Sequence, residues 1–321
     1  MAKETISIYL GSKCNMNCAY CHRQADKEEH GATGKLLKLL DEEHPKLIRF
    51  IGGEPTLYMQ DIKKVVKHCP WAKFHVTTNA VLLAECIGYF RKHNFKIIVS
   101  FDGNKNSSYR GYDPLEEVVD YPDMGISTTI CHGNTSFKKI LEGFCEAEKK
   151  IKRPLTFYPH IVHHTSEKNK EFALTLEDVD NLLAEYKYAI GKFWRDFSTF
   201  GVINKRYQSI FMQLLRLTEH PYEFGETYCT NKRLMKVNAD GEAFNCSYIR
   251  DVPATKNKKY MRAMFPACET CEVYHVCGGA CVQSVSHAIE CKFYHELYGF
   301  FLGFLEGLPK AKLRQLRRRL E

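Results

Sequence analysis

The chain has 321 residues, which is long enough for two domains with hydrophobic cores. Its content of 44% hydrophobic and 26% charged residues is ordinary for a globular protein, and its formal charge of +8 favours an acidic partner, either a peptide or a nucleic acid. The first residues lack an apolar signal segment, and the longest apolar run, near Phe300, is too short to span a bilayer. We therefore expect a cytoplasmic protein without a membrane partner.

Fourteen cysteines in a reducing compartment indicate metal ligands rather than disulfides. Cys14, Cys18 and Cys21 follow a strand expected at residues 6–10. Three thiolates on one loop can bind three corners of a four-iron cluster and leave the fourth iron for another ligand. A structural zinc site normally takes four protein ligands in a different spacing, and a chance cluster of core cysteines is the remaining alternative.

Strands then alternate with helices. Short runs rich in Ile, Val, Phe and Thr predict strands at residues 47–51, 73–79, 96–103, 125–130 and 155–162, with helices between them, for example at 83–92 and 137–150. This alternation predicts an α/β fold of parallel βαβ units. With residues 6–10 there are six strands, too few for a closed eight-stranded barrel.

The motif Cys14-x3-Cys18-x2-Cys21 resembles the cluster loop of the radical S-adenosylmethionine (SAM) superfamily. The resemblance implies a partial (β/α)6 TIM-like barrel and a [4Fe–4S] cluster whose open iron binds SAM. Electron transfer would cleave SAM to methionine and a 5′-deoxyadenosyl radical. The family aromatic residue that lies by the adenine matches Tyr20.

The same resemblance assigns SAM contacts to residues that follow the strands, where chemistry in such a barrel is located. Gly52, Gly53 and Glu54 match the segment that holds the SAM amino group, and Arg110 matches an arginine for the SAM carboxylate. Ser100 and Asp102 share one strand face and match contacts to the ribose and methionine portions. Asn79 is a weaker match, because Ala80 stands where relatives often have glycine. Turn glycines and a solvated arginine are the simpler interpretations.

A Thr175-x-x-Asp178 capping pattern begins an outer helix. From Gly191 to Phe224 the helical pattern loosens into an aromatic-rich stretch, which we interpret as a bridge between domains. We expect a barrel domain at 1–210, a cysteine-rich domain with the bridge at 211–305, and a basic helix at 306–321. That helix could bind an acidic peptide or nucleic acid, or be solvated, which is the interpretation we favour.

Seven cysteines and a hairpin turn at Asn238–Gly241 form the second constellation, which resembles the SPASM domain of peptide and protein maturases. In relatives, the matching positions bind two auxiliary [4Fe–4S] clusters. The farther cluster would use Cys268, Cys271, Cys277 and Cys291, and the nearer Cys229, Cys246 and Cys281. No eighth cysteine precedes Cys229 at 224–228, so the nearer cluster is expected to have an open or non-cysteine corner. A four-cysteine zinc ribbon is the competing interpretation.

Other thiols and imidazoles are most simply core or surface residues. Cys69, Cys86 and Cys145 fall in helices. Cys131 follows a strand at the catalytic end, where it could donate a hydrogen atom to a substrate radical, although packing is the simpler role. His132, His160, His163 and His164 also lie near strand ends and could take a proton.

These patterns predict a radical SAM enzyme of the SPASM peptide-maturase type. Its substrate would be a ribosomally synthesised precursor peptide, and its product a thioether or carbon–carbon crosslink, an epimer or an oxidised residue. We expect a flavodoxin- or ferredoxin-like electron donor. Since thirteen residues precede Cys14, leader recognition is expected from a separate protein or from the barrel and the basic helix. The alternatives are dehydrogenation of a small molecule or protein side chain, and a non-enzymatic metal- and nucleic-acid-binding protein.

Overall fold

The computed structural model describes residues 3–21, 31–114, 121, 124–230, 233–244, 261–262, 264–281 and 283–320. Cys246, a predicted ligand of the nearer auxiliary cluster, lies outside the described residues. In the described ranges no helix is long and apolar enough to cross a membrane.

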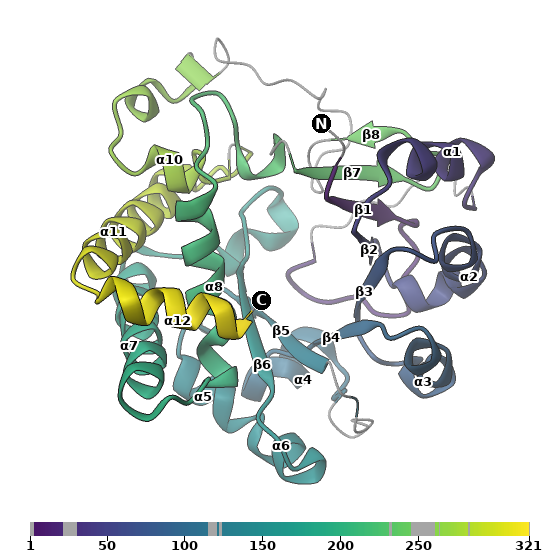
Figure 1. The fold of residues 1–321 in the computed structure, drawn as a ribbon, viewed down its shortest axis with the longest axis horizontal. Helices are drawn as coiled ribbons and strands as arrows, with labels where there is room; N and C mark the ends of the chain where they lie inside the picture. The colour runs from purple at the N-terminus through teal and green to yellow at the C-terminus, as the bar shows by residue number, and fades with distance from the viewer. Residues whose placement is uncertain are drawn as a thin grey trace.

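The core of the fold is an open eight-stranded sheet with the strand order β6-β5-β4-β3-β2-β1-β7-β8 (Figure 1). Its first six strands are parallel neighbours, which confirms the predicted α/β partial barrel. They are β1 Thr5–Tyr9, β2 Leu47–Ile51, β3 Lys73–Thr78, β4 Lys96–Ser100, β5 Met124–Ile130 and β6 Thr156–Ile161.

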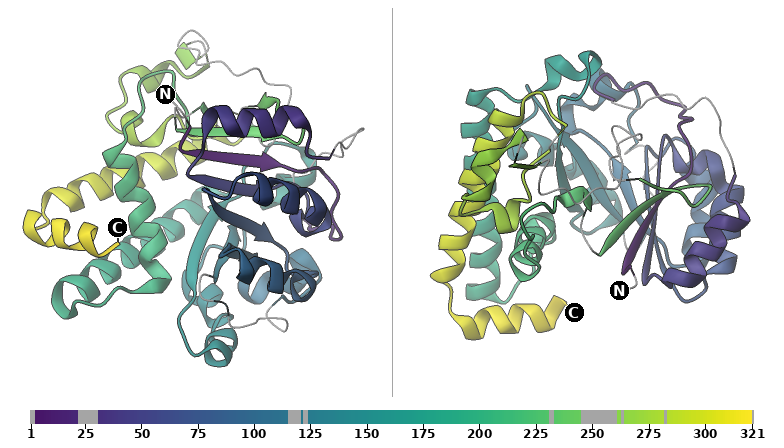
Figure 2. Two further views of the ribbon diagram at one scale, coloured as in Figure 1. Left: turned by 45° about the vertical axis from the view of Figure 1, so that its right-hand side comes forward. Right: turned by 90° about the horizontal axis from the view of Figure 1, so that it is seen from above.

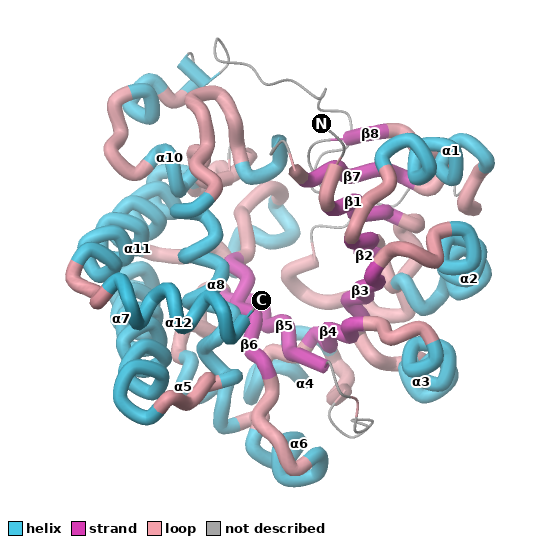
Figure 3. The backbone as a smooth tube through the Cα atoms, viewed as in Figure 1, coloured by secondary structure: helices cyan, strands magenta, loops and turns pink. Residues whose placement is uncertain are grey.

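Helices cover the convex face of this sheet, with the strands inside (Figure 3). They are α1 Gly34–Glu43, α2 Met59–His68, α3 Leu83–Lys92, α5 Phe137–Glu142 and α6 Cys145–Ile151. Alternate strand residues such as Ile8, Phe50 and Val76 are fully or almost fully buried against these helices. The intervening residues face the concave side of the sheet. The short helix α4 Asn106–Arg110 instead lies beyond the end of β4, where Tyr109 accepts from the Ala19 N–H of the cysteine loop.

The predicted hairpin is confirmed, but it extends the barrel sheet. Strands β7 Leu234–Asn238 and β8 Ala243–Phe244 pair antiparallel around Gly241, which has φ 82°. β7 also pairs in parallel with β1 along its whole length. The sequence did not reveal this seventh parallel strand, because register between distant segments leaves no local pattern.

The stretch at 191–224, where the helical pattern of the sequence loosens, is nevertheless helical over most of its length, and its interpretation as a bridge between domains stays a prediction. Helix α7 runs from Leu176 to Phe200 without a break at Gly191, and α8 spans Lys205–Glu219. Three aromatic residues of this stretch, Phe193, Phe197 and Phe211, are buried between the helices, whereas Phe200 is exposed. The Thr175 cap is confirmed as a full capping box with Asp178.

The remaining helices form a layer with α7 and α8 beside β6 (Figure 2). They are α10 Tyr274–Cys277, α11 His287–Glu306 and the basic helix α12 Lys310–Leu320. Leu316 is fully buried under α12, Arg317 pairs with Glu219, and Arg319 donates to the Gly201 carbonyl. One face of α12 is therefore docked on the ends of α7 and α8.

Candidate functional site

The three cysteines of the first motif lie together on the loop that follows β1. Burial raises the pKa of Cys18, and the neighbouring thiols of Cys21 and Cys14 raise it further against the opposing effect of Arg110. Two side-chain donors approach these sulfurs: Asn79 Nδ2 at 3.8 Å from Cys14 Sγ and Arg110 Nη1 at 3.9 Å from Cys18 Sγ. Adjacent soft thiols with N–H donors aimed at them suit an iron–sulfur cluster.

Gly52 and Gly53 allow a close approach, but the approaching group is the chain's own loop. A Cβ on Gly53 would lie 2.1 Å from the Lys13 carbonyl oxygen, and one on Gly52 would lie 2.6 Å from the Gly11 carbonyl oxygen. The Gly53 N–H donates to Gly11 and the Glu54 N–H donates to Lys13. These glycines therefore hold the loop that carries Cys14, and the proposed contact of their carbonyls with SAM remains a prediction.

The Glu54 side chain is held by the protein, and its expected contact with the SAM amino group stays a prediction. Its carboxylate is 1% exposed and accepts four hydrogen bonds. The donors are the Thr56 N–H and hydroxyl, the Thr78 hydroxyl and the Asn79 N–H, at 2.7–3.1 Å. Such a saturated buried carboxylate ties the ends of β2 and β3 together.

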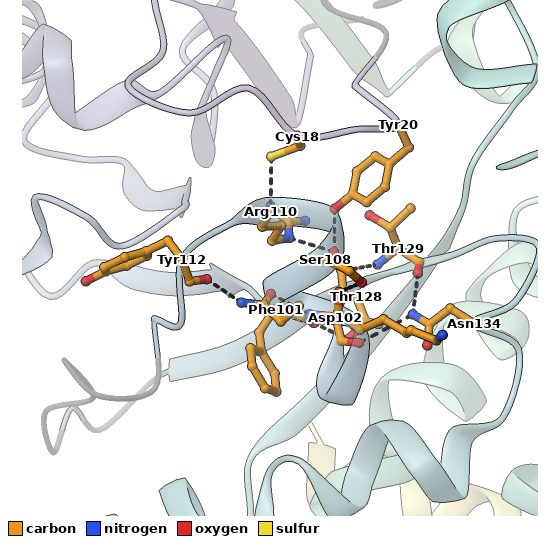
Figure 4. Close-up of polar contacts among 12 residues, drawn as sticks. Cys18, Tyr20, Phe101, Asp102, Ser108, Arg110, Tyr112, Thr128, Thr129 and Asn134 are labelled. Carbon is orange, nitrogen blue, oxygen red and sulfur yellow. Dashed lines mark hydrogen bonds and ion pairs between the residues drawn. The ribbon is translucent and has the colours of Figure 1, made fainter. Parts of the chain in front are cut away.

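Asp102 is the centre of a second buried network (Figure 4). The carboxylate is fully buried and accepts from Tyr20 Oη at 2.6 Å, Arg110 Nε at 2.7 Å and the Thr129 N–H at 2.8 Å. Burial raises the pKa of Tyr20 well above its ordinary value, so the phenol remains a donor. The network joins the cysteine loop to the ends of β4 and β5, with the Arg110 guanidinium between Asp102 and Cys18.

Asn79 also contacts the cysteine loop, since its Nδ2 donates to Asn15 at 2.7 Å. Its neighbour Ala80 has φ 68°, a left-handed conformation that favours glycine. The backbone at Ala80 thus adopts a conformation that a glycine would take with less strain. Ser100 is half-buried at the end of β4, in register with Ser127 of β5.

Cys131 is fully buried in a cluster with Tyr20, Val162 and Phe172, next to Cys18 and Ala19. Burial raises the pKa of this thiol to about 12, although a hydrogen bond with Tyr109 acts to lower it. The thiol is therefore neutral and packed against the cysteine loop. Its proposed role as a hydrogen donor stays a prediction. Of the other three, Cys69 and Cys86 are buried and Cys145 is half-buried.

The histidines near strand ends have different partners. His132 Nδ1 lies 2.8 Å from Asp178 of α7. His163 Nδ1 lies 2.6 Å from Glu290, and His164 Nδ1 lies 3.2 Å from Ser286, both at the start of α11. The loop after β6 is thereby attached to the segment that carries the last predicted cysteine ligands. Four cysteines lie there, Cys268, Cys271, Cys277 and Cys291, and the pKa of three of them is raised in part by others of this group.

Two observations show how closely this group is arranged. The pKa of Cys268 is raised to about 11, first by burial and then by Cys291 and Cys271. Burial also raises the pKa of Cys277 to about 12, while the N–H groups of Ala280 and Gly279 donate to its sulfur and oppose the rise. Residues 278–280 all have positive φ. Successive N–H groups turned toward one sulfur form an anion-binding concavity of the kind found at iron–sulfur sites.

The nearer auxiliary site is only partly described. Cys229 accepts from Lys236 Nζ at 3.3 Å, Cys281 is half-buried, and Cys246 lies outside the described residues. Across the described ranges, no three His, Cys, Asp or Glu side chains converge on a single-metal site. Sequence reasoning missed Lys236, Thr78 and Tyr109, because their roles depend on contacts between distant segments.

Curated relatives match only part of the chain. A probable GTP 3′,8-cyclase of Methanopyrus kandleri is 28% identical over 141 residues, which is 42% of this chain and 46% of its own length. The radical SAM cyclopropyl synthase TigE of Paramaledivibacter caminithermalis is 25% identical over 148 residues, 36% of this chain and 31% of its own length. The chain thus spans about half the length, or less, of these relatives.

Solved structures match along most of the chain. The structure of anSMEcpe with bound AdoMet is 19% identical with a TM-score of 0.65, and covers 94% of this chain and 97% of its own. SuiB of Streptococcus suis is 18% identical with a TM-score of 0.58, over 87% of this chain and 73% of its own. Both proteins also have peptide-bound structures, anSMEcpe with the Kp18Cys peptide and SuiB with the precursor peptide SuiA.

These likenesses agree with the fold described above. Residues 8–179, more than half of the chain, match the Radical SAM superfamily. That range contains the cysteine loop, the glycine pair and the Asp102 network. The chain is a member of the Radical SAM superfamily.

Proposed function

We propose that this radical SAM enzyme modifies a residue of a ribosomally synthesised peptide and uses two auxiliary [4Fe–4S] clusters. Family membership implies SAM and one [4Fe–4S] cluster, which Cys14, Cys18 and Cys21 would hold. When bound, these groups supply an electron and a 5′-deoxyadenosyl radical that removes a hydrogen atom from an unactivated carbon. The product would be a thioether or carbon–carbon crosslink, an epimer or an oxidised residue.

One observation carries the peptide-maturase proposal. A second group of four cysteines, whose thiols raise one another's pKa, lies on a segment that is joined to the barrel mouth by His163–Glu290 and His164–Ser286. A cysteine-rich domain that functioned independently of the barrel would not require these two contacts. The link supports a site where auxiliary clusters accept an electron from, or bind a sulfur of, a substrate held at the mouth.

The chain's own residues would position the reactants and exclude water. The Glu54 network and the Gly53–Gly11 contact fix the start of the cysteine loop, and the Asp102 network fixes its end. Tyr20, Tyr109 and Phe172 pack edge to face beside Cys18, which keeps this side of the loop dry. A rigid, dry site favours reaction at the positioned C–H bond over quenching by solvent.

The peptide-bound structures of anSMEcpe and SuiB support a peptide substrate. A flavodoxin- or ferredoxin-like protein is the proposed electron donor, and a separate leader-binding protein remains part of the proposal. The second candidate is radical chemistry on a small molecule or a protein side chain. The partial likeness to probable GTP 3′,8-cyclases favours a small molecule in that case.

Anaerobic reconstitution tests the proposal. Three clusters predict about 12 iron atoms per chain, and SAM with dithionite should give 5′-deoxyadenosine. Incubation with the peptide encoded beside the gene should change that peptide's mass or stereochemistry. About 4 iron atoms per chain, or zinc in place of the auxiliary iron, would contradict the auxiliary clusters. SAM cleavage that is stimulated by GTP and not by any peptide would favour the second candidate.

A further inference from the structure

Basic side chains form a row across the concave face of the sheet. Strand register places Lys236 beside Ser7, Ser7 beside Arg49, Arg49 beside His75, and His75 beside Lys96. Residues paired in register share a face, and the residues flanking Arg49 and His75 are buried against the outer helices. The row therefore lines the interior of the open barrel.

The interior row has no compensating acid on the strands. None of strands β1 to β7 contains an aspartate or glutamate. Arg49 is half-buried, and within the described ranges its guanidinium has no carboxylate partner. Lys236 is directed to Cys229, and Lys96 lies over the Tyr158 ring. Among the basic residues of the row, Arg49 is thus the one whose positive charge is least compensated by the described residues around it.

The curvature of the sheet brings a second strand opposite Arg49. His160 of β6 is four strands away from β2, yet the Arg49 guanidinium acts on it. His160 is exposed, on the face of β6 opposite its buried neighbours Pro159 and Ile161. Its pKa is lowered by the surrounding protein first and by Arg49 second. The pKa of His75 is lowered to about 3, by burial first and then by Arg49 and Lys96. Both imidazoles are neutral at pH 7, so the interior disfavours further positive charge.

We infer that Arg49 binds a carboxylate of the peptide substrate inside the barrel. This inference rests on the proposed function and adds an acidic residue to the substrate class. One guanidinium between two neutral imidazoles suits a single carboxylate, which it can bind in bidentate fashion. A triphosphate would ordinarily require several free cations or a helix N-terminus.

The position of Arg49 makes such a contact useful. Arg49 precedes the end of β2 at Ile51 by two residues, or about 7 Å. The glycine pair that holds the Cys14 loop follows immediately. An acidic side chain that reaches down to Arg49 would keep its own backbone at the mouth, beside the cysteine loop. The carboxylate would set which residue of the peptide is presented for hydrogen abstraction.

A pair of short peptides tests the inference on the reconstituted, SAM-bound protein. The probes are an acetylated, amidated pentapeptide of four glycines around a central aspartate, and its twin with a central asparagine. Titration calorimetry should give at least a tenfold preference for the aspartate peptide in the unaltered protein. Arg49→Gln should reduce the preference to less than twofold, and Arg49→Lys should restore part of it. Arg195→Gln, an exposed arginine on α7, is the matched control and should leave the preference unchanged.

A second measurement keeps the test valid if Arg49→Gln alters the fold. NMR titration of His75 should show a higher pKa in Arg49→Gln, because a neighbouring positive charge is removed. An unchanged His75 pKa in a folded variant would contradict the shared interior.

Equal binding of the two peptides, with SAM cleavage intact, would overturn the inference and leave the proposed function standing. Arg49-dependent binding of GTP without discrimination between the peptides would overturn it in favour of a phosphate. Arg49-dependent binding of the aspartate peptide, with no peptide modified, would support the inference and count against the proposed function.

Discussion

The thiols of Cys14, Cys18 and Cys21 lie on a loop that is held by residues following three other strands. The second group of thiols lies on one continuous segment, from Cys268 to Cys291. In the first region the Gly53 N–H, the Asn79 amide and the Arg110 guanidinium all contact the loop. In the second, the Cys277 sulfur accepts from Gly279 and Ala280, only a few residues away.

The two regions should therefore depend on the barrel fold to different extents. The first region is part of the barrel, so disturbing one of its contacts should affect the fold and the cofactor site together. The second region contacts the loop after β6 at His163–Glu290 and His164–Ser286, and its Val273 and Val276 pack in the same core as the barrel. The donors to its Cys277 sulfur, however, belong to its own segment. Loss of a cluster there should therefore leave the barrel folded and able to cleave SAM.

Replacing cysteines in the two regions should give the largest contrast. Cys18→Ser should abolish SAM cleavage, a loss of at least about 1,000-fold, since we propose that the thiolate is a ligand of the cluster that binds SAM. Cys277→Ser should keep SAM cleavage within about tenfold but abolish peptide product. Anaerobic assays of 5′-deoxyadenosine and of peptide mass give the two rates. Loss of SAM cleavage in Cys277→Ser, with the barrel folded, would contradict the separation.

Removing the charge of Arg110 should destabilise the barrel strongly. Arg110→Gln leaves the fully buried Asp102 without its ion-pair partner, which typically costs about 3–5 kcal/mol of unfolding free energy. It also removes the donor to Cys18, so the cluster should be harder to reduce, because N–H···S bonds raise reduction potentials. Urea unfolding and a redox titration monitored by EPR measure the two effects.

The double variant Asp102→Asn/Arg110→Gln is the control, because it removes both charges and should recover most of the stability while the potential stays low. A normal potential with weakened SAM binding would instead support the predicted contact between Arg110 and the SAM carboxylate.

The sequence predicted the parts of both regions that are set by local pattern. The cysteine spacing, the alternating strands and the Asn238–Gly241 turn are local, and the strands and the turn are found where they were expected. The partners of Glu54 and Asp102 could not be predicted, because each carboxylate is bound by donors from distant strands. The helices over 191–224 were missed since their aromatic residues face helices on several sides and blur the periodicity.

Adding one methyl group at Gly53 should lower the unfolding free energy nearly as much as Arg110→Gln does. In Gly53→Ala the new Cβ would meet the Lys13 and Ser12 carbonyl oxygens at 2.1 and 2.5 Å, and both belong to backbone that cannot rotate away. We expect a loss of about 3 kcal/mol in unfolding free energy, together with reduced iron content. Gly34→Ala is the control, because no atom lies within 4 Å of its Cβ at the start of α1. It should gain about 0.5–1 kcal/mol. Equal changes in unfolding free energy for the two substitutions would show that the loop at Ser12 and Lys13 can move to accommodate the new methyl group.

The smallest predicted effect concerns one alanine in each region, each with a left-handed backbone conformation. Ala80, after β3, and Ala280, between Cys277 and Cys281, both adopt left-handed conformations, with φ 68° and 54°. An alanine in this conformation is strained by about 1 kcal/mol, so each glycine variant should gain up to that amount, less the added entropy of the unfolded chain. Because Ala80 belongs to the barrel, Ala80→Gly should raise the midpoint of global urea unfolding. Ala280→Gly should leave that midpoint unchanged and slow only the loss of auxiliary iron to a chelator. A rise of the global midpoint in both variants would mean that the two regions unfold as one unit.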